Sequence, residues 1–447
     1  MSHTLPVIVI GAGPVGLAAA AHAIARGLDP LVLEAGPGAG AGIRRWGHVR
    51  MFSPWRYNID DASARLLEAN GWTRPDGHAY PTGRELVERY LEPLAAVPAL
   101  ASRIRFGTRV VAVAREHHDL MKDGGRAEAP FVVRTAGPAG EHDVLARAVI
   151  DASGTIETPG VLGASGLPAV GERAAAGVIT YGIPDVLGTS RTRYAGRRVL
   201  VVGSGHSALN ALLDLAQLAV DDEATRIVWA VRRPSLGQLL GGARADELEE
   251  RGRLGARVRG LLDTGRLDLV TDFHCDRVTR TADGVVASAG ARDLPPVDEI
   301  IVATGFRPDW SILSEVRLDL DPAVESPRAL APLIDPNVHS CGTVRPHGAV
   351  ELAHPDANLF AIGMKSYGRA PTFLMLTGFE QARSVVSAIA GDWEAARRVE
   401  LVLPETGVCS LDGAGDGAGG CCGSTAAVPV AIGRRPAAPP AATSCCP

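Results

Sequence analysis

Two glycine-rich segments, nearly two hundred residues apart, have the composition of dinucleotide-binding turns. Gly11–Gly16 reads Gly-Ala-Gly-Pro-Val-Gly, and Gly203–Ala208 reads Gly-Ser-Gly-His-Ser-Ala. Each follows a β-branched apolar run, Val7–Ile10 or Val199–Val202, and each precedes a stretch rich in alanine and leucine. A strand, a GxGxx(G/A) turn and a helix in this order place a diphosphate on the amide groups of the helix N-terminus. The chain is therefore predicted to contain two dinucleotide-binding sites.

One such site is typical of a dehydrogenase, whereas two indicate a flavoprotein that takes hydride from a nicotinamide nucleotide and passes electrons through a bound flavin. In the first segment Gly11 permits the tight turn, Gly13 lets the backbone approach the diphosphate, and Gly16 lets the helix pack on the strand. Glu34 ends the next predicted strand, 18 residues after Gly16. A carboxylate at this place accepts hydrogen bonds from ribose hydroxyls; the alternative is a solvated glutamate at a strand end.

Residues 36–58 concentrate arginine and aromatic side chains in a chain that is only 4% aromatic. Arginine pairs with phosphate, and flat rings pack on a flavin. Arg44 and Trp46 are therefore predicted to contact the first cofactor. Plain packing explains any one of these residues equally well.

The second site carries a signal for the type of nicotinamide nucleotide. The predicted strand 226–231 ends in Arg232 and Arg233, where an NAD site normally has an acid. Two guanidinium groups suit a 2′-phosphate, so NADPH is favoured over NADH. The alternative is a pair of surface arginines in an arginine-rich chain, whose 45 basic residues include only two lysines. His206, at the predicted helix start, is interpreted as a cofactor contact or a cap rather than a proton-transfer group.

The elements around these motifs predict an α/β fold. Two small-residue turns, Asp151–Gly154 and Ala303–Phe306, each end a buried strand and bracket an insertion. We expect two Rossmann-like, three-layer dinucleotide-binding domains, with the NADPH domain inserted in the FAD domain and a disordered C-terminal tail. The expected boundaries are 1–160 and 305–403 for the FAD domain, 161–304 for the NADPH domain and 404–447 for the tail.

Three further segments complete the expected FAD domain. Residues 81–95 have a helical pattern that starts at Thr82-Gly83, and strand segments at 109–114 and 131–134 predict a β-meander. A last helix, at about 377–390, would present its N-terminal amides to the negative charge of a reduced flavin.

Bulk composition excludes some classes of partner. The 447 residues carry a formal net charge of −5, which implies neither nucleic acid nor an anionic membrane as a partner. The first strand begins by Leu5, which leaves no room for a secretory signal, and no run of about 18 apolar residues occurs. We expect a cytoplasmic enzyme with a small-molecule substrate. Whether the protein forms a homodimer is left open at this point.

The ordered set of motifs resembles the two-dinucleotide-binding-domain flavoproteins and, within them, the flavin-containing monooxygenase branch. The resemblance covers roughly residues 5–395 and rests on GAGPVG with Glu34, the turn at Asp151, GSGHSA and the turn at Ala303. It implies FAD at the first turn, NADPH at the second, and molecular oxygen as a co-substrate. A flavin C4a-hydroperoxide would then oxygenate a soft nucleophile such as sulfur or nitrogen.

The chain departs from this family at two points. Residues 179–185 lack the histidine of the F-x-G-x-x-x-H-(S/T) signature, and Gly363-Met364 stands where many relatives have Gly-Asp. The remaining residues expected at the cofactors are Pro14, Val110, Ser153, Gly154, Gly205, Ser207, Ala208, Thr304, Gly305, Gly363, Met364 and Gly378. The candidates for catalysis are Tyr57, Asn58 and Tyr181, and those for lining the same pocket are Trp55, Lys365 and Tyr367. A core or hinge role explains an isolated tyrosine or asparagine equally well.

The seven cysteines suggest a second idea. The body of the chain has no CxxC, which argues against a built-in redox disulfide. The adjacent pairs Cys421-Cys422 and Cys445-Cys446 lie in the tail and suit thiophilic ions such as arsenite and mercury. Because flavin monooxygenase-like proteins occur in arsenic resistance, a trivalent arsenical is a candidate substrate. An unselected tail with incidental cysteines is the alternative.

Two other function classes stay open at this point. An NADPH-dependent reductase would pass electrons from the flavin to a disulfide, a metal ion or a quinone. A flavin-binding sensor would use both nucleotides for signalling alone.

Overall fold

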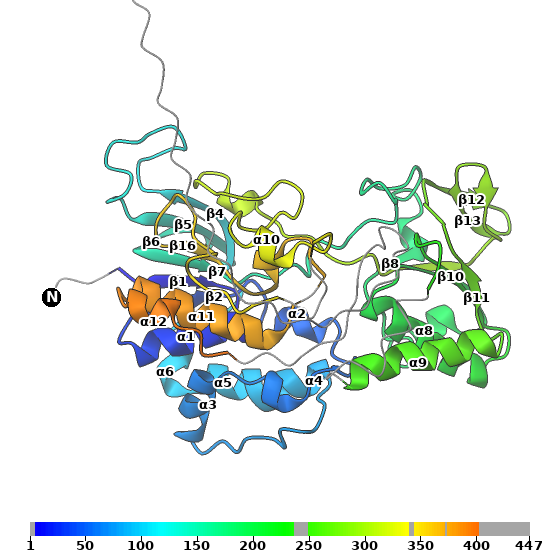
Figure 1. Ribbon diagram of the computed structural model, residues 1–447, viewed down its shortest axis with the longest axis horizontal. Coiled ribbons are helices and arrows are strands. Elements are labelled where there is room, and N and C mark those ends of the chain that lie inside the picture. Colours follow the sequence, from blue (N-terminus) through cyan, green and yellow to red (C-terminus); the bar gives the residue numbers. More distant parts are fainter. Residues whose placement is uncertain (1–4, 237–248, 339–343, 372, 402–447) are drawn as a thin grey trace, which may run out of the picture. The chain divides into compact units, whose positions relative to one another are not determined.

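Two parallel five-stranded sheets form the framework (Figure 1). The computed structural model describes residues 5–236, 249–338, 344–371 and 373–401. The first sheet has the strand order β16-β7-β1-β2-β3, with strands β1 (Val7–Ile10), β2 (Pro30–Leu33), β3 (Ile104–Arg105), β7 (Ala148–Asp151) and β16 (Leu359–Ala361). The second sheet has the order β11-β10-β9-β15-β8, with strands β8 (Ile179–Tyr181), β9 (Arg198–Val202), β10 (Arg226–Ala230), β11 (Asp268–Val270) and β15 (Glu299–Val302).

The strands of the second sheet all lie between β7 and β16 in the sequence, so the second domain is an insertion in the first, as expected. The two connecting segments run side by side. Pro159 pairs with Phe306 in an antiparallel bridge, and the Gly160 amide donates to the Gly305 carbonyl oxygen at 2.7 Å. The boundaries expected from the sequence stay predictions, and the expected tail, 404–447, lies outside the described residues.

The first domain has three layers because its strands are apolar on both faces. Val7 and Val9 of β1 belong to one core cluster with the helices α1 (Pro14–Ala25) and α11 (Met375–Ile389). Ile8 and Ile10 belong to another, with a three-stranded antiparallel sheet. The strands of that sheet are β4 (Arg109–Arg115), β5 (Phe131–Gly137) and β6 (Gly140–Ala146). Figure 1 shows the helices and this small sheet on opposite sides of β1 and β7.

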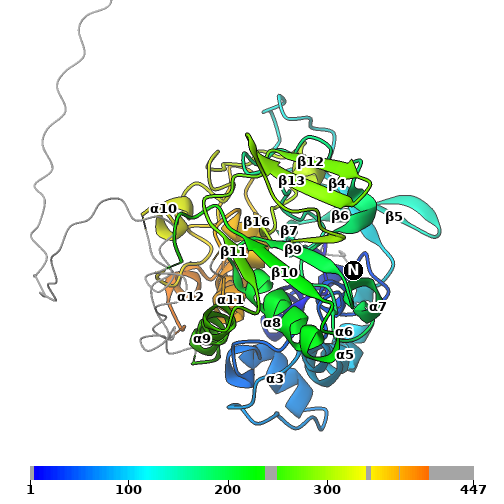
Figure 2. The ribbon, with the colours of Figure 1, turned by 90° about the vertical axis from the view of Figure 1, so that its right-hand side faces the viewer.

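The second domain repeats this plan. Val199 and Val201 of β9 pack on the side of α8 (His206–Asp221) and α9 (Glu249–Asp263), while Leu200 and Val202 pack on the other side. That side is covered by β12 (Arg277–Thr281), β13 (Gly284–Ala289) and β14 (Arg292–Asp293). Figure 2 shows β12 and β13 across the parallel sheet from α8 and α9. The predicted fold class, two three-layer dinucleotide-binding domains, is confirmed.

The helical segment predicted at 81–95 is one helical run made of three parts. These are α4 (Gly83–Leu86), the π-helical turn η2 (Val87–Leu91) and α5 (Glu92–Ala96). Thr82 caps it: its Oγ1 accepts from the Glu85 amide at 3.1 Å, and a Glu85 carboxylate oxygen accepts from the Thr82 amide at 2.8 Å. The hydrogen bond that the Thr82 amide donates to this carboxylate is the main cause that lowers the pKa of Glu85. Gly83 lets the helix approach Trp46, because a Cβ there would lie 2.8 Å from Trp46 Cε3.

Short elements connect these layers. The α-helices among them are α2 (Ala41–Arg44), α3 (Asp61–Glu68), α6 (Pro98–Ala101), α7 (Arg191–Tyr194), α10 (Ala331–Ile334) and α12 (Trp393–Arg397). The 3₁₀ turns are η1 (Trp55–Tyr57), η3 (Ala176–Val178), η4 (Ser311–Leu313) and η5 (Gly363–Tyr367). Within the described ranges, no helix is long and apolar enough to cross a membrane.

Replacing Thr82 by alanine removes the hydroxyl that caps α4 and is expected to lower the free energy of unfolding by about 1 kcal/mol. Urea unfolding followed by circular dichroism measures this loss. Thr192→Ala, at an exposed position of α7, is the matched control, and its effect should stay within about 0.5 kcal/mol. Equal effects of the two substitutions would contradict the capping role.

Candidate functional site

Both glycine turns start at a point where the strand order of a parallel sheet reverses. In the first sheet the chain passes from β1 through α1 to β2 on one side, while β7 lies on the other side of β1. In the second, it passes from β9 through α8 to β10, while β15 lies on the other side of β9. A crevice at the carboxyl ends of the strands forms at such a point and is the usual place for a dinucleotide.

The first glycine turn is crowded at Gly11 and Gly16 and open at Gly13. Gly11 has φ = +100°, and a Cβ there would lie 2.9 Å from the Ala152 carbonyl oxygen. A Cβ on Gly16 would lie 2.0 Å from the Gly11 carbonyl oxygen, whereas one on Gly13 would meet nothing within 4 Å. The N-cap of α1, Gly13, makes no side-chain capping hydrogen bond. The helix N-terminus therefore leaves its amides to an anion that comes close to the backbone, and an FAD diphosphate fits this cradle.

The second glycine turn has the same geometry. Gly203 has φ = +127°, and a Cβ there would lie 2.2 Å from the Ala303 carbonyl oxygen. Gly205 is open, since a Cβ there would meet nothing within 4 Å, and it is the N-cap of α8 without a side-chain capping bond. His206, Ser207 and Ala208 form the first turn of α8. An NADPH diphosphate fits here for the same reason that FAD fits at the first turn.

Glu34 follows the end of β2 and ties it to the first glycine turn. One carboxylate oxygen accepts from the Ala12 amide and the other from the Gly36 amide, both at 2.6 Å. A carboxylate has about four acceptor positions, so it keeps capacity for ribose hydroxyls. The Thr108 amide donates to the Glu34 carbonyl oxygen at 2.8 Å, which brings the start of β4 beside the site. Val110 of β4 is buried in the core below.

The arginine- and aromatic-rich segment is largely held by its own contacts. Arg44 forms an ion pair with Glu92 on α5, and Trp46 packs against the start of α4 at Gly83. Trp55 is buried at the start of η1. These contacts fix the loop beside the first site, and the contacts of Arg44 and Trp46 with the cofactor stay predictions.

The two catalytic candidates in this loop differ in exposure. Asn58 is fully buried, and its amide nitrogen donates to the carbonyl oxygens of Ser53 at 2.8 Å and Pro54 at 3.0 Å. Its Oδ1 accepts from the Ser53 hydroxyl at 2.8 Å. Tyr57 is partly exposed, and the guanidinium carbon of Arg56 lies 4.7 Å from the centre of the Tyr57 ring. Asn58 thus holds the turn that presents Tyr57, and the catalytic role of both residues stays a prediction.

The third catalytic candidate, Tyr181, lies at the end of β8 in the second domain. Its hydroxyl donates to Glu172 at 2.6 Å, and burial together with this carboxylate raises the pKa of Tyr181. Glu172 is itself buried and also accepts from the amides of Leu162 and Ala169. Glu172 therefore ties Tyr181 to the loop that contains Leu162 and Ala169. A catalytic role for Tyr181 stays a prediction.

A buried polar network joins η5 to α11. The Gly363 amide donates to Gln381 Oε1 at 2.7 Å, and Gln381 Nε2 lies 2.9 Å from both the Ser366 hydroxyl and His347 Nε2. Burial lowers the pKa of His347, which keeps its ring neutral and able to accept from Gln381. Gln381 and His347 carry no sequence signal, because they meet only in the folded chain.

The residues expected around this network occupy different environments. Gly378 lets α11 lie against α1, since a Cβ there would come within 2.5 Å of a Val15 methyl group. Met364 is partly exposed, and Tyr367 is buried beside His347. Lys365 is also buried, in an ion pair with Asp151.

Four more residues expected at the cofactors lie in the turns that follow β7 and β15. The Ser153 amide donates to an Asp151 carboxylate oxygen at 3.0 Å, and Gly154 has φ = +73°. Thr304 donates to the Val161 carbonyl oxygen at 3.0 Å, and Gly305 has φ = +93°.

Arg232 and Arg233 follow the end of β10, the strand beside β9, where an adenine ribose of a dinucleotide lies in this fold. Arg232 is exposed, and one of its guanidinium nitrogens donates to the Ala164 carbonyl oxygen at 3.2 Å. This bond leaves most of the five donors of the guanidinium for a phosphate.

An aromatic contact joins the loop of the first domain to the second glycine turn. The ring of Phe52 stacks on that of His206, with centroids 4.9 Å apart and planes inclined by 30°. Phe52 belongs to the arginine- and aromatic-rich segment, and His206 begins α8. The segment expected to contact the first cofactor therefore touches the start of the helix that follows the second glycine turn.

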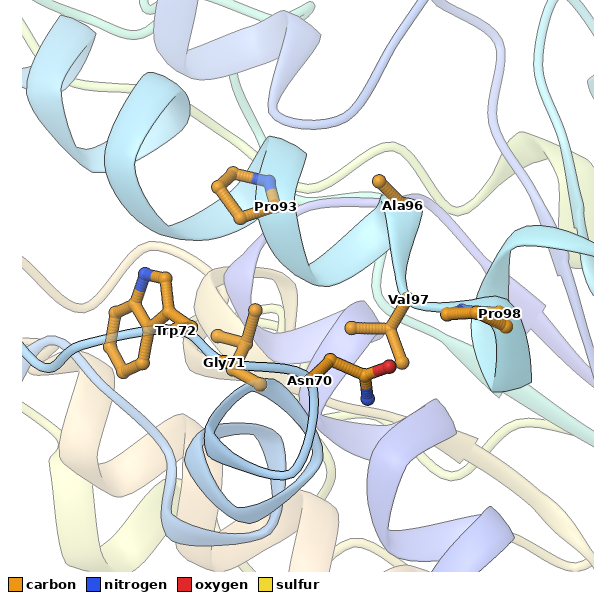
Figure 3. A pocket seen from close by; sticks show the side chains of 8 residues that line it. Asn70, Gly71, Trp72, Pro93, Ala96, Val97 and Pro98 are labelled. Atoms are coloured by element: carbon orange, nitrogen blue, oxygen red, sulfur yellow. The ribbon is translucent and has the colours of Figure 1, made fainter.

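A shallow surface groove of about 430 Å³ lies between α3 and the α5–α6 region (Figure 3). It is lined by Leu67, Asn70, Gly71, Trp72, Pro93, Ala96, Val97 and Pro98. None of these residues belongs to a glycine turn, so the groove is separate from the dinucleotide sites.

In the described part of the chain, no group of three or more histidine, cysteine, aspartate or glutamate side chains is arranged to hold a metal ion. The cysteines predicted to bind thiophilic ions, Cys421, Cys422, Cys445 and Cys446, lie outside the described residues.

With this geometry established, comparison with known proteins identifies the family. A model of the family described as pyridine nucleotide-disulphide oxidoreductase matches residues 8–327. The chain belongs to this family.

Two relatives share sequence with it. Ferredoxin–NADP reductase of Salinispora tropica is 28% identical over 321 residues, which cover 71% of this chain and 79% of that protein. Indole-3-pyruvate monooxygenase YUCCA1 of Oryza sativa subsp. japonica is 30% identical over 216 residues, which cover 47% of this chain and 45% of the relative.

Solved structures that share the fold include the following two. Bacillithiol disulfide reductase Bdr of Bacillus cereus superposes with a TM-score of 0.62 at 20% identity, over 87% of this chain and 99% of that one. DfoA, a cadaverine monooxygenase of Erwinia amylovora solved with FAD, superposes with a TM-score of 0.59 at 15% identity, over 90% and 99%. The predictions of a two-dinucleotide flavoprotein oxidoreductase, with FAD and NADPH as its cofactors, are confirmed.

The open glycines provide a test that separates binding from folding. Gly13→Ala adds a methyl group that meets no protein atom within 4 Å but blocks the approach of a diphosphate, so it is expected to weaken FAD binding at least about tenfold. The melting temperature of the apoprotein should stay unchanged. Gly205→Ala is the matched variant at the second turn and should weaken NADPH binding while FAD binding is retained.

Fluorescence titration of apoprotein with FAD, and of holoprotein with NADP⁺, measures the two effects. If both variants lost both nucleotides equally, the assignment of one nucleotide to each turn would be wrong.

Proposed function

We propose that this protein is an NADPH-dependent flavoprotein monooxygenase. NADPH at the second glycine turn reduces FAD at the first. The flavin, when bound, supplies the chemistry that transfers one oxygen atom from molecular oxygen to a soft nucleophile, while the two electrons from NADPH reduce the other atom to water. Sulfur, nitrogen and trivalent arsenic are the candidate atoms.

The observation that carries the reductive half of this proposal is the stack of Phe52 on His206. Phe52 comes from the loop expected to wrap the flavin, and His206 from the turn expected to hold NADPH. Hydride transfer requires the nicotinamide ring to lie close to the flavin ring. The contact between Phe52 and His206 favours such an approach. His206 at the helix start, with Phe52 against it, has the position of a cofactor contact rather than of a proton-transfer group.

The state of the cysteines favours oxygen over a disulfide as the electron acceptor. In the described ranges the one cysteine is Cys275, which is buried in the core of the second domain. Burial raises the pKa of its thiol to about 11, so it stays protonated at neutral pH and is a poor nucleophile. A relay of electrons from flavin to disulfide requires a reactive thiolate. The sequence has no CxxC to supply one, so one of the pairs Cys421-Cys422 and Cys445-Cys446 would have to substitute for it.

The protein side chains near the first site support binding and shielding rather than acid–base catalysis. Glu34 and the amides at the start of α1 would hold the ribose and the diphosphate. Trp55 and Asn58 are buried and Thr82 caps its helix, so the segment beside the first site is held in place. Oxygen transfer by a flavin requires the exclusion of water, and a fixed segment supports this exclusion.

A second candidate is an NADPH-dependent reductase that passes electrons to a metal ion, a quinone or a protein disulfide. The sequence match to ferredoxin–NADP reductase, which covers 71% of this chain, favours it. The distinction lies in what the reduced flavin does with oxygen.

The test is to reduce the holoenzyme with NADPH under anaerobic conditions and then mix it with oxygenated buffer. A monooxygenase is expected to delay the return of the oxidised flavin spectrum and to release less than one hydrogen peroxide per flavin when a thioether, an amine or a trivalent arsenical is present. Product formation should be coupled to NADPH oxidation for one of these substrates. Immediate reoxidation with one peroxide per flavin, whatever is added, would contradict the proposal and favour the reductase.

The preference for NADPH is tested at Arg232 and Arg233. The double variant Arg232→Ala/Arg233→Ala is expected to raise KM for NADPH at least about tenfold, because two charge-assisted contacts with the 2′-phosphate are lost. KM for NADH should change by less than about twofold, since NADH has no such phosphate. Arg226→Ala, an exposed arginine at the other end of β10, is the control and should leave both constants unchanged. Parallel loss with both nucleotides would show that the pair does not read the phosphate.

A further inference from the structure

Lys365 has an environment that is unusual for a lysine. Its side chain is 1% exposed, and its ammonium nitrogen lies 2.5 Å from an Asp151 carboxylate oxygen and 3.3 Å from the Ser153 hydroxyl. The ammonium also lies 5.1 Å from the centre of the Trp310 ring, within range of a cation–π interaction.

The carboxylate partner is buried at the floor of the FAD site. Asp151 is 0% exposed and ends β7. In register it lies between Ile10 of β1 and Ala361 of β16, so it stands at the carboxyl edge where the strand order reverses. The next residue, Ala152, provides the carbonyl oxygen on which Gly11 rests.

An unpaired carboxylate at this place would oppose the cofactor. A buried charge is costly unless it is paired, and the FAD diphosphate brings further negative charge to the same edge of the sheet. The second carboxylate that acts on Lys365 is Asp309, which is exposed and whose pKa is lowered chiefly by hydrogen bonds from Ser311. Asp151 is therefore the buried charge that Lys365 must balance.

We propose that Lys365 is a positioning residue for FAD: its ammonium neutralises Asp151, so the diphosphate binds over a floor without net negative charge. The carboxylate in turn shapes the floor, because its other oxygen accepts from the Ser153 amide at 3.0 Å. The inference rests on FAD occupying the first glycine turn.

The choice of lysine supports a role for a compact cation. The chain has 45 basic residues, and all but Lys122 and Lys365 are arginines. A lysine concentrates its charge in a small ammonium, whereas an arginine needs room for a planar fork. The Lys365 ammonium lies close to Asp151, Ser153 and the Trp310 ring as such a compact cation.

The two single substitutions have different expected effects on FAD affinity. Lys365→Met leaves Asp151 buried without its cation and is expected to raise Kd for FAD at least about tenfold. Asp151→Asn keeps an oxygen for the Ser153 amide but leaves a free ammonium near the diphosphate, so Kd should stay unchanged or fall. The double variant Lys365→Met/Asp151→Asn should return to within about threefold of wild type, because it removes both charges.

The experiment is a titration of each apoprotein with FAD, followed by quenching of flavin fluorescence, together with melting temperatures with and without FAD. Lys122→Met is the matched control: its ammonium is on the surface, where it donates to the His117 carbonyl oxygen, and its Kd for FAD should equal that of wild type. Both single variants lose an ion pair and are expected to melt earlier as apoproteins. Saturating FAD should raise the melting temperature of Asp151→Asn by at least as much as that of wild type.

Two results would overturn the inference. Similar losses of FAD affinity in both single variants would show a structural pair without an electrostatic effect on the cofactor, as would a double variant no better than Lys365→Met. If Lys365→Met does not fold, Asp151→Asn alone decides, because a tenfold loss of affinity in it contradicts the proposal. Failure of the wild-type apoprotein to bind FAD would instead refute the proposed function.

Discussion

Both dinucleotide sites depend on one kind of contact, the approach of a glycine backbone to the carbonyl oxygen of a neighbouring turn. Gly11 rests on Ala152 and Gly203 on Ala303, at distances that exclude any side chain. Each contact occurs where the strand before the glycine turn and the strand beside it end together, so the glycine turn is supported by the neighbouring turn. This support leaves Gly13 and Gly205 open and the first amides of α1 and α8 without side-chain caps. A site for an anion follows from the packing of the backbone alone.

The two sites differ in the charges that surround this common geometry. In the first, acidic groups lie close to the anion site, and each is satisfied: Glu34 by two backbone amides and Asp151 by the Lys365 ammonium. In the second, arginines follow the strand beside the glycine turn. We propose that the first site offers its nucleotide a neutralised surface and the second a cationic edge; the Phe52–His206 stack joins the segment 36–58 to the start of α8.

The local patterns in the sequence were sufficient to predict the framework. The strand Val7–Ile10, the start of the helical run at Thr82 and the turns after β7 and β15 were all found where propensity and spacing placed them. The inserted domain followed from the repetition of these turns. The hairpin of β12 and β13 and the helix α9 were not predicted, because tertiary packing rather than local pattern decides them.

The details of the site were harder to predict because they depend on residues far apart in the chain. Asp151 and Lys365 are separated by 214 positions, and Gln381 reaches His347 across 34. Asn58 was expected to face a substrate, yet its amide bonds are made within its own turn. Tyr181 was expected beside the flavin and is engaged by Glu172, a residue without any motif. The roles of these side chains in catalysis, the cytoplasmic location and the function of the cysteine pairs remain predictions.

The central claim is that each glycine turn holds its own nucleotide, FAD at Gly11–Gly16 and NADPH at Gly203–Ala208. Amide hydrogen exchange of the apoprotein, with FAD added first and NADP⁺ second, tests it most directly. The account predicts that FAD slows exchange of the amides that begin α1, and that NADP⁺ then slows exchange of those that begin α8. Protection of the same segment by both nucleotides, or of neither segment by either, would contradict it.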